Sequence, residues 1–257
     1  MNTMTLQQRI EAAGKEGRLA RIPFITAGFP DKTAFFVHLR ELDRNGADII
    51  EVGIPFSDPV ADGPVVEEAS RRVLETGITL EWILAQLKAL QPRLQAGLVL
   101  MGYYNPFLQY GLERFACDAA AAGVQGVIVP DLPLEESNEL QVILRTAGID
   151  LITLVGPNTD DTRMRAYAAK ATGFVYVVSV MGTTGARTGL LPEADETIAR
   201  ARKAFSLPVA LGFGIQSPEQ LRGMHARPDA VVFGSALLRH IDAKGEVASF
   251  MAGWRDV

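Results

Sequence analysis

Short apolar runs alternate with longer amphipathic stretches along the whole chain. The runs are rich in β-branched residues, which is typical of buried strands, and the stretches repeat apolar residues every three or four positions, which is typical of surface helices. The predicted strands are Ile22–Thr26, Asp48–Val52, Leu98–Met101, Gly126–Val129, Leu151–Leu154, Phe174–Val178, Val209–Leu211 and Ala230–Phe233. The predicted helices are Thr5–Glu16, Lys32–Asn45, Leu80–Leu90, Leu108–Ala121, Leu134–Ala147, Thr159–Ala171, Glu193–Ala204, Pro218–His225 and Ala236–Ile241.

This alternation predicts an α/β fold built on a parallel sheet. The strands are nearly continuous apolar runs, as expected for a sheet that is covered on its faces. Eight strand–helix units in 257 residues match the size of a (β/α)8 TIM barrel, here with an extra N-terminal helix. An open doubly wound sheet is the alternative. No linker or shift in composition divides the chain, so we expect one domain over residues 1–257.

Composition narrows the class of protein. The net charge of −5 argues against a general affinity for nucleic acid, and the absence of an eighteen-residue apolar run argues against a membrane span. One cysteine, Cys117, permits no internal disulfide and indicates a reducing, cytoplasmic setting. Its helical surroundings predict a buried small hydrophobe rather than a nucleophile. The three histidines stand far apart, so no metal site is expected.

Acidic residues follow the second predicted strand. Glu51 closes the apolar run 47–52, and the loop that leads to Pro64 carries Asp62. At the mouth of a barrel a carboxyl group is partly desolvated, which raises its pKa and suits it to proton transfer. The alternatives are a buried salt bridge for Glu51 and a turn-capping role for Asp62. Tyr103 and Tyr176 also end strands, where each could bind a substrate or fill the barrel.

Three glycine-bearing segments follow the last three predicted strands: Gly182–Gly185, Gly212–Gly214 and Gly234–Ser235. Glycine lets backbone N–H groups approach an anion closely, and Ser235 could open a helix whose N-terminus faces that anion. The alternative is that these glycines only form tight turns. Their shared place at one end of the barrel predicts a phosphate site.

Several segments resemble the α subunit of tryptophan synthase. They are "PFITAGFP", "GADIIEVGIPFSDPVADGP", "LMGYYNP", "GVIVPDLPLEES", "GFVYVVSVMGTTGAR", "LGFGI" and "VVFGSAL". The resemblance implies a lyase that cleaves indole-3-glycerol phosphate into indole and glyceraldehyde 3-phosphate by a retro-aldol reaction. It also implies an α2β2 complex in which pyridoxal phosphate belongs to the β subunit, so that this chain needs no cofactor.

The resemblance also assigns roles to residues. It implies that Glu51 is the principal acid–base group and that Asp62 engages the indole nitrogen. Phosphate-binding positions are Gly185, Gly214, Gly234 and Ser235. Substrate-binding positions are Tyr176 and Phe213, with Tyr103, Leu100, Ile22 and Ile128 expected to line the pocket. Thr184 is implied as the partner of Asp62 in a lid over residues 180–191. Contact with the β subunit is expected at Phe56–Pro59 and Tyr104–Pro106.

Two residues depart from the pattern of many relatives, Phe29 and Met181, and neither removes a catalytic group. Three other functions remain open at this stage. A stand-alone indole-3-glycerol phosphate lyase would share the same residues. A non-catalytic activator of a β subunit would not need both carboxylates. Another phosphate-binding barrel, such as a sugar-phosphate isomerase, would have to match these segments by chance.

Overall fold

The computed structural model describes residues 4–178, 192–212, 214–222 and 224–255. Four of the residues singled out above lie outside the described residues: Met181, Thr184, Gly185 and Phe213. The whole of the expected lid, residues 180–191, also lies outside them. No described helix is long and apolar enough to cross a membrane.

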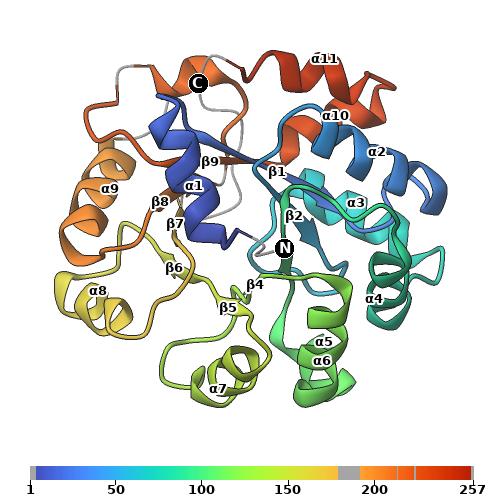
Figure 1. Cartoon of the computed structure of the whole chain (residues 1–257), viewed down its shortest axis with the longest axis horizontal. Coiled ribbons are helices and arrows are strands. Elements are labelled where there is room, and N and C mark those ends of the chain that lie inside the picture. The colour runs from blue at the N-terminus through green and yellow to red at the C-terminus, as the bar shows by residue number, and fades with distance from the viewer. Residues whose placement is uncertain (1–3, 179–191, 213, 223, 256–257) are drawn as a thin grey trace.

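The described strands form one parallel sheet that closes into a barrel (Figure 1). They are β1 Ala20–Thr26, β2 Ile49–Gly53, β3 Gly97–Met101, β4 Gly126–Ile128, β5 Asp150–Leu151, β6 Thr153–Val155, β7 Val175–Val178, β8 Val209–Gly212 and β9 Ala230–Phe233. Their order is β5-β4-β3-β2-β1-β9-β8-β7-β6. The two end strands, β5 and β6, are separated in sequence only by Ile152, so the sheet meets itself there. This confirms the predicted barrel and excludes the open sheet; the predicted strand Leu151–Leu154 is interrupted at Ile152.

Helices surround the barrel (Figure 1). They are α1 Leu6–Lys15, α2 Lys32–Arg44, α3 Pro64–Leu74, α4 Leu80–Ala89, α5 Tyr104–Tyr110, α6 Leu112–Ala122, α7 Asn138–Thr146, α8 Asp161–Ala168, α9 Pro192–Ala204, α10 Ser235–Asp242 and α11 Val247–Ala252, with a 3-10 turn at Pro218–Leu221. The predicted helix 108–121 is divided at Gly111, whose φ of 91° ends α5 and precedes α6. The predicted helix 218–225 is only the 3-10 turn.

Helix α1 closes the N-terminal end of the barrel, where Figure 1 shows it lying across the strands. Leu6 is fully buried and packs against the first residues of β3 and β4, Gly97 and Gly126. A Cβ atom at these glycines would lie 2.9 Å and 2.7 Å from Leu6, so a side chain at either position would force Leu6 to move. With this end filled, a ligand has access only from the carboxyl ends of the strands.

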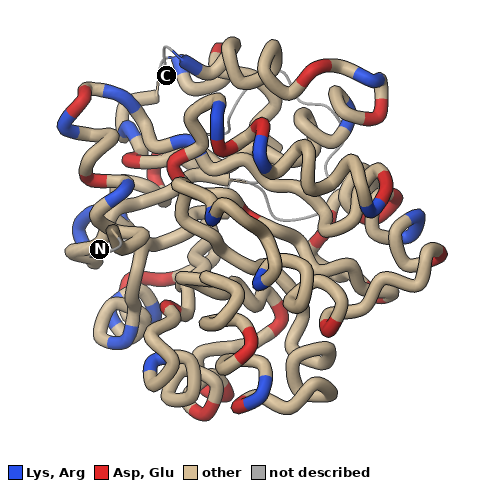
Figure 2. Tube along the Cα trace, turned by 45° about the vertical axis from the view of Figure 1, so that its right-hand side comes forward, with Lys and Arg blue, Asp and Glu red and all other residues tan. Residues whose placement is uncertain are grey.

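The core lies inside the barrel and between the barrel and its helices. All residues of β1, β2, β3, β4, β8 and β9 are buried. Charged positions of both signs are interspersed over the outer helices in the view of Figure 2. Cys117 is exposed on α6, so the prediction of a buried cysteine is wrong: it lies beside the buried positions Phe115, Ala116 and Ala119 but faces outward.

Candidate active site

A cavity of about 660 Å³ opens at the carboxyl ends of the strands. Its wall brings together the two carboxyl groups, Glu51 and Asp62, with Tyr176 and the predicted phosphate-binding positions Gly214, Gly234 and Ser235. Other described lining residues are Phe24, Val60, Ala61, Gly63, Pro64, Val65, Val66, Met101, Pro130, Leu154, Val155, Gly156, Asn158, Thr159, Val178, Gln216, Val232 and Arg239. The cavity therefore combines an apolar region with a few polar groups, as is usual for a small-molecule site.

Glu51 lies in the middle of the buried strand β2, paired in register with Phe24 of β1 and Val99 of β3. Its exposed fraction is 1%, and its Oε2 atom has no hydrogen-bond partner among the described residues. Burial raises the pKa of Glu51 to about 8, and the negative charge of Asp62 adds to this effect. No described lysine or arginine forms an ion pair with it, so the salt-bridge alternative is wrong for this part of the chain.

Asp62 reaches the cavity from the loop between β2 and α3 and is half-buried. Burial raises its pKa to about 6; the Tyr103 hydroxyl opposes this shift and the Glu67 charge adds to it. The N-cap of α3 is Gly63, and no side chain caps that helix. Among the described residues, no backbone N–H donates to the Asp62 carboxyl group, so the turn-capping alternative is not supported there, and the residue lines the cavity.

Tyr103 supports the loop that carries Asp62. Its hydroxyl oxygen accepts a hydrogen bond of 2.9 Å from the backbone N–H of Ala61, which leaves the hydroxyl proton to be donated toward Asp62. The ring stacks on Phe56 with centroids 5.3 Å apart. Tyr103 is buried and does not line the cavity, so it contacts the loop that carries Asp62 and not the cavity itself.

Two aromatic rings require glycine at neighbouring strand ends. A Cβ atom at Gly212 would lie 2.2 Å from the hydroxyl oxygen of Tyr176. A Cβ atom at Gly53 would lie 2.4 Å from the Phe24 ring, and one at Gly234 2.8 Å from it. Burial raises the pKa of the Tyr176 hydroxyl well above its ordinary value, and the nearby Glu51 adds to the shift, so Tyr176 stays a neutral phenol.

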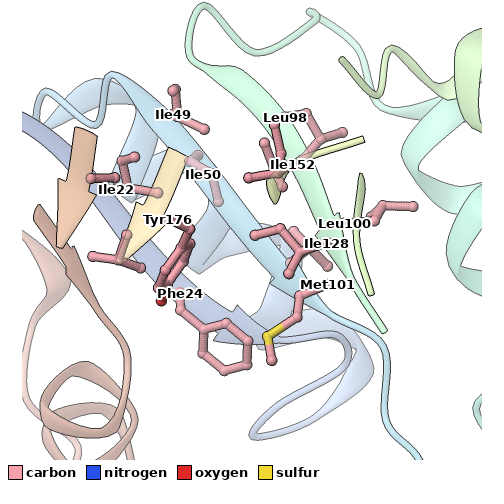
Figure 3. Packing of buried hydrophobic residues seen from close by; sticks show 14 of the residues in the cluster. Ile22, Phe24, Ile49, Ile50, Leu98, Leu100, Met101, Ile128, Ile152 and Tyr176 are labelled. Carbon is pink, nitrogen blue, oxygen red and sulfur yellow. The ribbon is translucent and has the colours of Figure 1, made fainter. Parts of the chain in front are cut away.

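Three residues that were expected to line the pocket, Leu100, Ile22 and Ile128, do not line the cavity. Leu100 is fully buried and does not line the cavity, whereas its neighbour Met101 does, because successive side chains of a strand point to opposite faces. In Figure 3, Met101 and Phe24 point toward each other while Leu100 points away. Ile22 and Ile128 are also buried away from the lining. Their apolar character matched a pocket, but the strand phase and depth decide which residue reaches it.

The predicted phosphate-binding positions that the structure describes lie together at the cavity. Gly214 has a φ of 83°, which favours glycine, and Gly234 is the N-cap of α10, which starts at Ser235. No described side chain caps α10, so its first backbone N–H groups have no side-chain acceptor in this part of the chain and could bind an anion. Contributions from Thr184, Gly185 and Phe213 stay predictions.

Several lining residues were missed in the sequence. Phe24 and Met101 sit in quoted motifs, and strand alternation counted from Glu51 could have selected them. Asn158, Gln216 and Arg239 carry no such signal, because only the closed barrel brings their loops and helix to the cavity. No group of three potential metal ligands occurs among the described His, Cys, Asp and Glu residues.

The two expected partner-contact segments lie near this mouth. Tyr103 links them, because its ring stacks on Phe56 and it directly precedes Tyr104. Val60, next to the first segment, has an exposed fraction of 81%. The backbone N–H of Tyr104 donates to Asp131 at 2.9 Å, which holds the second segment. Contact with a partner at these segments stays a prediction.

Sequence comparison gives one consistent family. A family model described as "Tryptophan synthase alpha chain" matches residues 10–252. The tryptophan synthase alpha chain of Nitratidesulfovibrio vulgaris (strain DP4) is 62% identical over 256 residues, covering 100% of both chains. That of Geobacter sulfurreducens is 45% identical over 245 residues, covering 93% of each.

Solved structures agree with the sequence comparison. A chain of Mycobacterium tuberculosis tryptophan synthase superposes with a TM-score of 0.87 at 34% identity, covering 97% of this chain and 98% of that one. A chain from the tryptophan synthase a2b2 complex of Pyrococcus furiosus gives a TM-score of 0.83 at 39% identity, covering 93% of this chain and 96% of that one.

Proposed function

Because this chain belongs to the tryptophan synthase alpha chain family, we propose that Glu51 and Asp62 perform its carbon–carbon bond cleavage at the mouth of the barrel. The chain is a lyase of tryptophan biosynthesis that converts indole-3-glycerol phosphate into indole and glyceraldehyde 3-phosphate. The observation that carries the residue assignment is the Glu51 carboxyl group: it is buried in the wall of the cavity, and its Oε2 has no hydrogen-bond partner among the described residues.

Cleavage needs a better leaving group than an indole carbanion. Glu51 donates its proton to ring carbon C3, which gives an indolenine cation that can accept the electrons of the breaking bond. The Glu51 carboxylate then takes the proton from the adjacent glycerol hydroxyl. As the C–C bond breaks, its electron pair restores the aromatic ring, and the hydroxyl carbon becomes the aldehyde of glyceraldehyde 3-phosphate. Proton transfer of this kind contributes roughly 10²–10⁴-fold.

Asp62 stabilises the cation formed in the first step. Its pKa of about 6 makes it a carboxylate at neutral pH, while the pKa of Glu51, about 8, keeps that group protonated. Two carboxyl groups with separated pKa values are suited to different roles at one pH. Activity should therefore be highest between about pH 6 and pH 8, where Asp62 is ionised and Glu51 still holds its proton.

The other residues of the cavity wall suggest how the substrate is oriented, with its indole ring and its phosphate at different residues. The indole ring lies against the apolar side chains of Phe24, Met101 and Leu154, near Tyr176. The phosphate lies at Gly214, Gly234 and Ser235, where the N-terminus of α10 faces the cavity. Gly185 and Phe213 complete the phosphate site, and Thr184 in the lid pairs with Asp62, as the family resemblance implies.

We propose a β subunit as the partner. The relative from Pyrococcus furiosus was solved as an a2b2 complex, which supports the same assembly for this chain. Segments Phe56–Pro59 and Tyr104–Pro106 form the contact, and pyridoxal phosphate belongs to the β subunit. The proposed steps use only side chains and backbone groups of this chain. We assign residues 1–257 to one barrel domain and place it in the cytoplasm.

The test is indole release from indole-3-glycerol phosphate by the purified chain, alone and with a β subunit of the family. Slow release that rises with the β subunit is the expected result. Fast release that ignores the β subunit would identify a stand-alone lyase. No release in either condition would contradict the proposed reaction, and normal release by Glu51→Gln would contradict the residue assignment.

A further inference from the structure

Arg239 lies in the wall of the active-site cavity. It is on α10, four residues after Ser235, and residues with this spacing share one face of a helix. Ser235 and Arg239 both line the cavity, so this face of α10 presents its N-terminal N–H groups and a guanidinium group to the same space. The helix N-terminus at Ser235 was predicted with the glycine segments, whereas Arg239 was not.

The Arg239 guanidinium group has no partner among the described residues. Its guanidinium group forms no ion pair or hydrogen bond with any residue in the part of the chain that the structure describes, whereas many other arginines of the outer helices do pair with carboxylates. Arg239 is exposed, and a guanidinium group presents its N–H donors in a rigid planar fork. Within the described part of the chain, no side chain competes with a ligand for the donors of this guanidinium group.

The charges in the cavity favour a cationic group beside a bound phosphate. Among its described lining residues the charged side chains are Glu51, Asp62 and Arg239, so the other two are acidic. A phosphate monoester carries a charge near −2 at neutral pH. The neutral backbone donors at Gly214, Gly234 and Ser235 orient such a group but do not balance its charge, and an ionised Asp62 repels it.

We propose that Arg239 binds the substrate phosphate through its guanidinium group and makes the site selective for a phosphorylated, dianionic substrate. The inference rests on the proposed function, because the phosphate belongs to indole-3-glycerol phosphate. Arg239 completes the site that the N-terminus of α10 begins, and a guanidinium group can bind two phosphate oxygens at once. Its contribution is to substrate binding and not to the chemical step.

The alternative role for Arg239 is structural. It lies in the last turn of α10, where a cation interacts favourably with the helix dipole. Arg145 is a matched control, because it is an exposed arginine in the last turn of α7 and does not line the cavity. A purely structural effect should be similar in Arg239→Gln and Arg145→Gln.

The experiment measures the Kd of inorganic phosphate and of indole for the purified chain by calorimetry at low and high salt. Cleavage kinetics are measured in parallel with the β subunit. Arg239→Gln should raise the Kd of inorganic phosphate and the KM of indole-3-glycerol phosphate about five- to tenfold, and should weaken the salt dependence. The kcat and the Kd of indole should stay within about twofold, and Arg239→Lys should be intermediate because it keeps the charge but loses the fork of donors.

Three results would overturn the proposal: a phosphate Kd in Arg239→Gln within twofold of wild type, an equal change in Arg145→Gln, or a loss confined to kcat. Failure of the wild-type chain to bind inorganic phosphate would also overturn it. Wild-type phosphate binding that depends on Arg239, combined with no cleavage of indole-3-glycerol phosphate, would contradict the proposed function and leave the phosphate role of Arg239 supported.

Discussion

Glu51 is an ionisable residue buried at a position where its carboxyl group is removed from water. A strand interior normally carries apolar side chains, yet this carboxyl group is 1% exposed and its Oε2 has no described partner. A buried polar group without a hydrogen bond costs roughly 1–3 kcal/mol. This burial suits the proton-transfer role proposed for Glu51, because it brings the pKa of Glu51 to about 8, near the neutral range in which acid–base catalysts work best.

Replacing Glu51 by glutamine keeps its shape and removes its proton chemistry. We expect the kcat for indole release to fall roughly 10²–10⁴-fold, which is the usual contribution of general acid–base catalysis. The Kd of inorganic phosphate should be unchanged, because the proposed phosphate site consists of Gly214, Gly234 and Ser235 and does not include Glu51. Steady-state kinetics and calorimetry measure the two quantities, and a variant that keeps a tenth of wild-type turnover would exclude Glu51 as the principal proton carrier.

The same substitution should stabilise the protein at alkaline pH. The folded-state pKa of Glu51, about 8, is above the ordinary value, so the folded chain keeps a proton that the unfolded chain releases. This contribution to the free energy of unfolding is complete below the unfolded pKa, declines as pH rises, and is lost once pH exceeds about 8. The free energy of unfolding of Glu51→Gln should therefore be higher than that of wild type by on the order of 2–4 kcal/mol at pH 9. At pH 4 the two proteins should differ little in stability.

Urea unfolding of both proteins from pH 4 to pH 9 measures this difference. Equal pH dependence in the two proteins would show that Glu51 titrates normally in the folded state.

At the residue scale, sequence reasoning located the two carboxyl groups because their chemistry is unusual for their place. It could not choose between Leu100 and Met101, which are both apolar. That choice depends on the inward or outward phase of β3, which pairing with β2 and β4 sets. Arg239 was invisible for another reason: an arginine on a helix is ordinary until the fold places it at a cavity.

At the scale of elements, the β2–α3 loop is a support for Asp62. Tyr103 of the next strand–helix junction binds this loop through the N–H of Ala61 and stacks on Phe56. The loop thus spans two neighbouring units of the barrel. Helix α3 then begins at Pro64, whose missing N–H costs nothing at the first helical position.

Removing the Tyr103 hydroxyl should change the pH profile of the enzyme. The hydroxyl lowers the pKa of Asp62, so Tyr103→Phe should raise it and move the acidic limb of kcat/KM to higher pH. At pH 6 we expect kcat/KM to fall roughly three- to tenfold, consistent with the loss of one hydrogen bond to a charged group. Alkaline activity should be close to normal.

The control for this prediction is Asp62→Asn, which has no carboxyl group to titrate and should be slow with no acidic limb near pH 6. An unchanged acidic limb in Tyr103→Phe would show that Tyr103 only fills space.

The helix predictions failed where the local signal was weak. Helix α3 buries Ala69, Ser70 and Val73, of which the first two are too small and too weakly apolar to give a clear period. Helix α11 has six residues, which is too short for periodicity to be recognised. Most strands were easier to place, because both of their faces are buried and their apolar runs are unbroken; the interrupted pair β5 and β6, on either side of Ile152, is less buried.

At the scale of the whole molecule, the two ends of the barrel differ: one end is filled by a helix and the other contains the cavity. Helix α1 fills the N-terminal end through Leu6, and the carboxyl ends of the strands surround the cavity. Stability and function are therefore carried largely by opposite ends, as is common in this architecture.

Leu6→Ala tests this separation. Truncating a fully buried leucine should lower the free energy of unfolding by roughly 2–4 kcal/mol. The KM and kcat measured well below the unfolding temperature should stay within about twofold, because Leu6 does not line the cavity. Urea unfolding and steady-state kinetics measure both, and a tenfold loss of kcat in the folded variant would show that the two ends are coupled.

The contact between Gly212 and Tyr176 has a consequence for how such a site can diverge. The phenol occupies the volume that any side chain at position 212 would need, since a Cβ atom there would lie 2.2 Å from its oxygen. A change at position 212 alone is therefore blocked, and a smaller ring at 176 must come first. Because Tyr176 also lines the cavity, that first step alters the site before the second can occur. Substitutions at the two positions can therefore occur in only one order, first at position 176 and then at position 212.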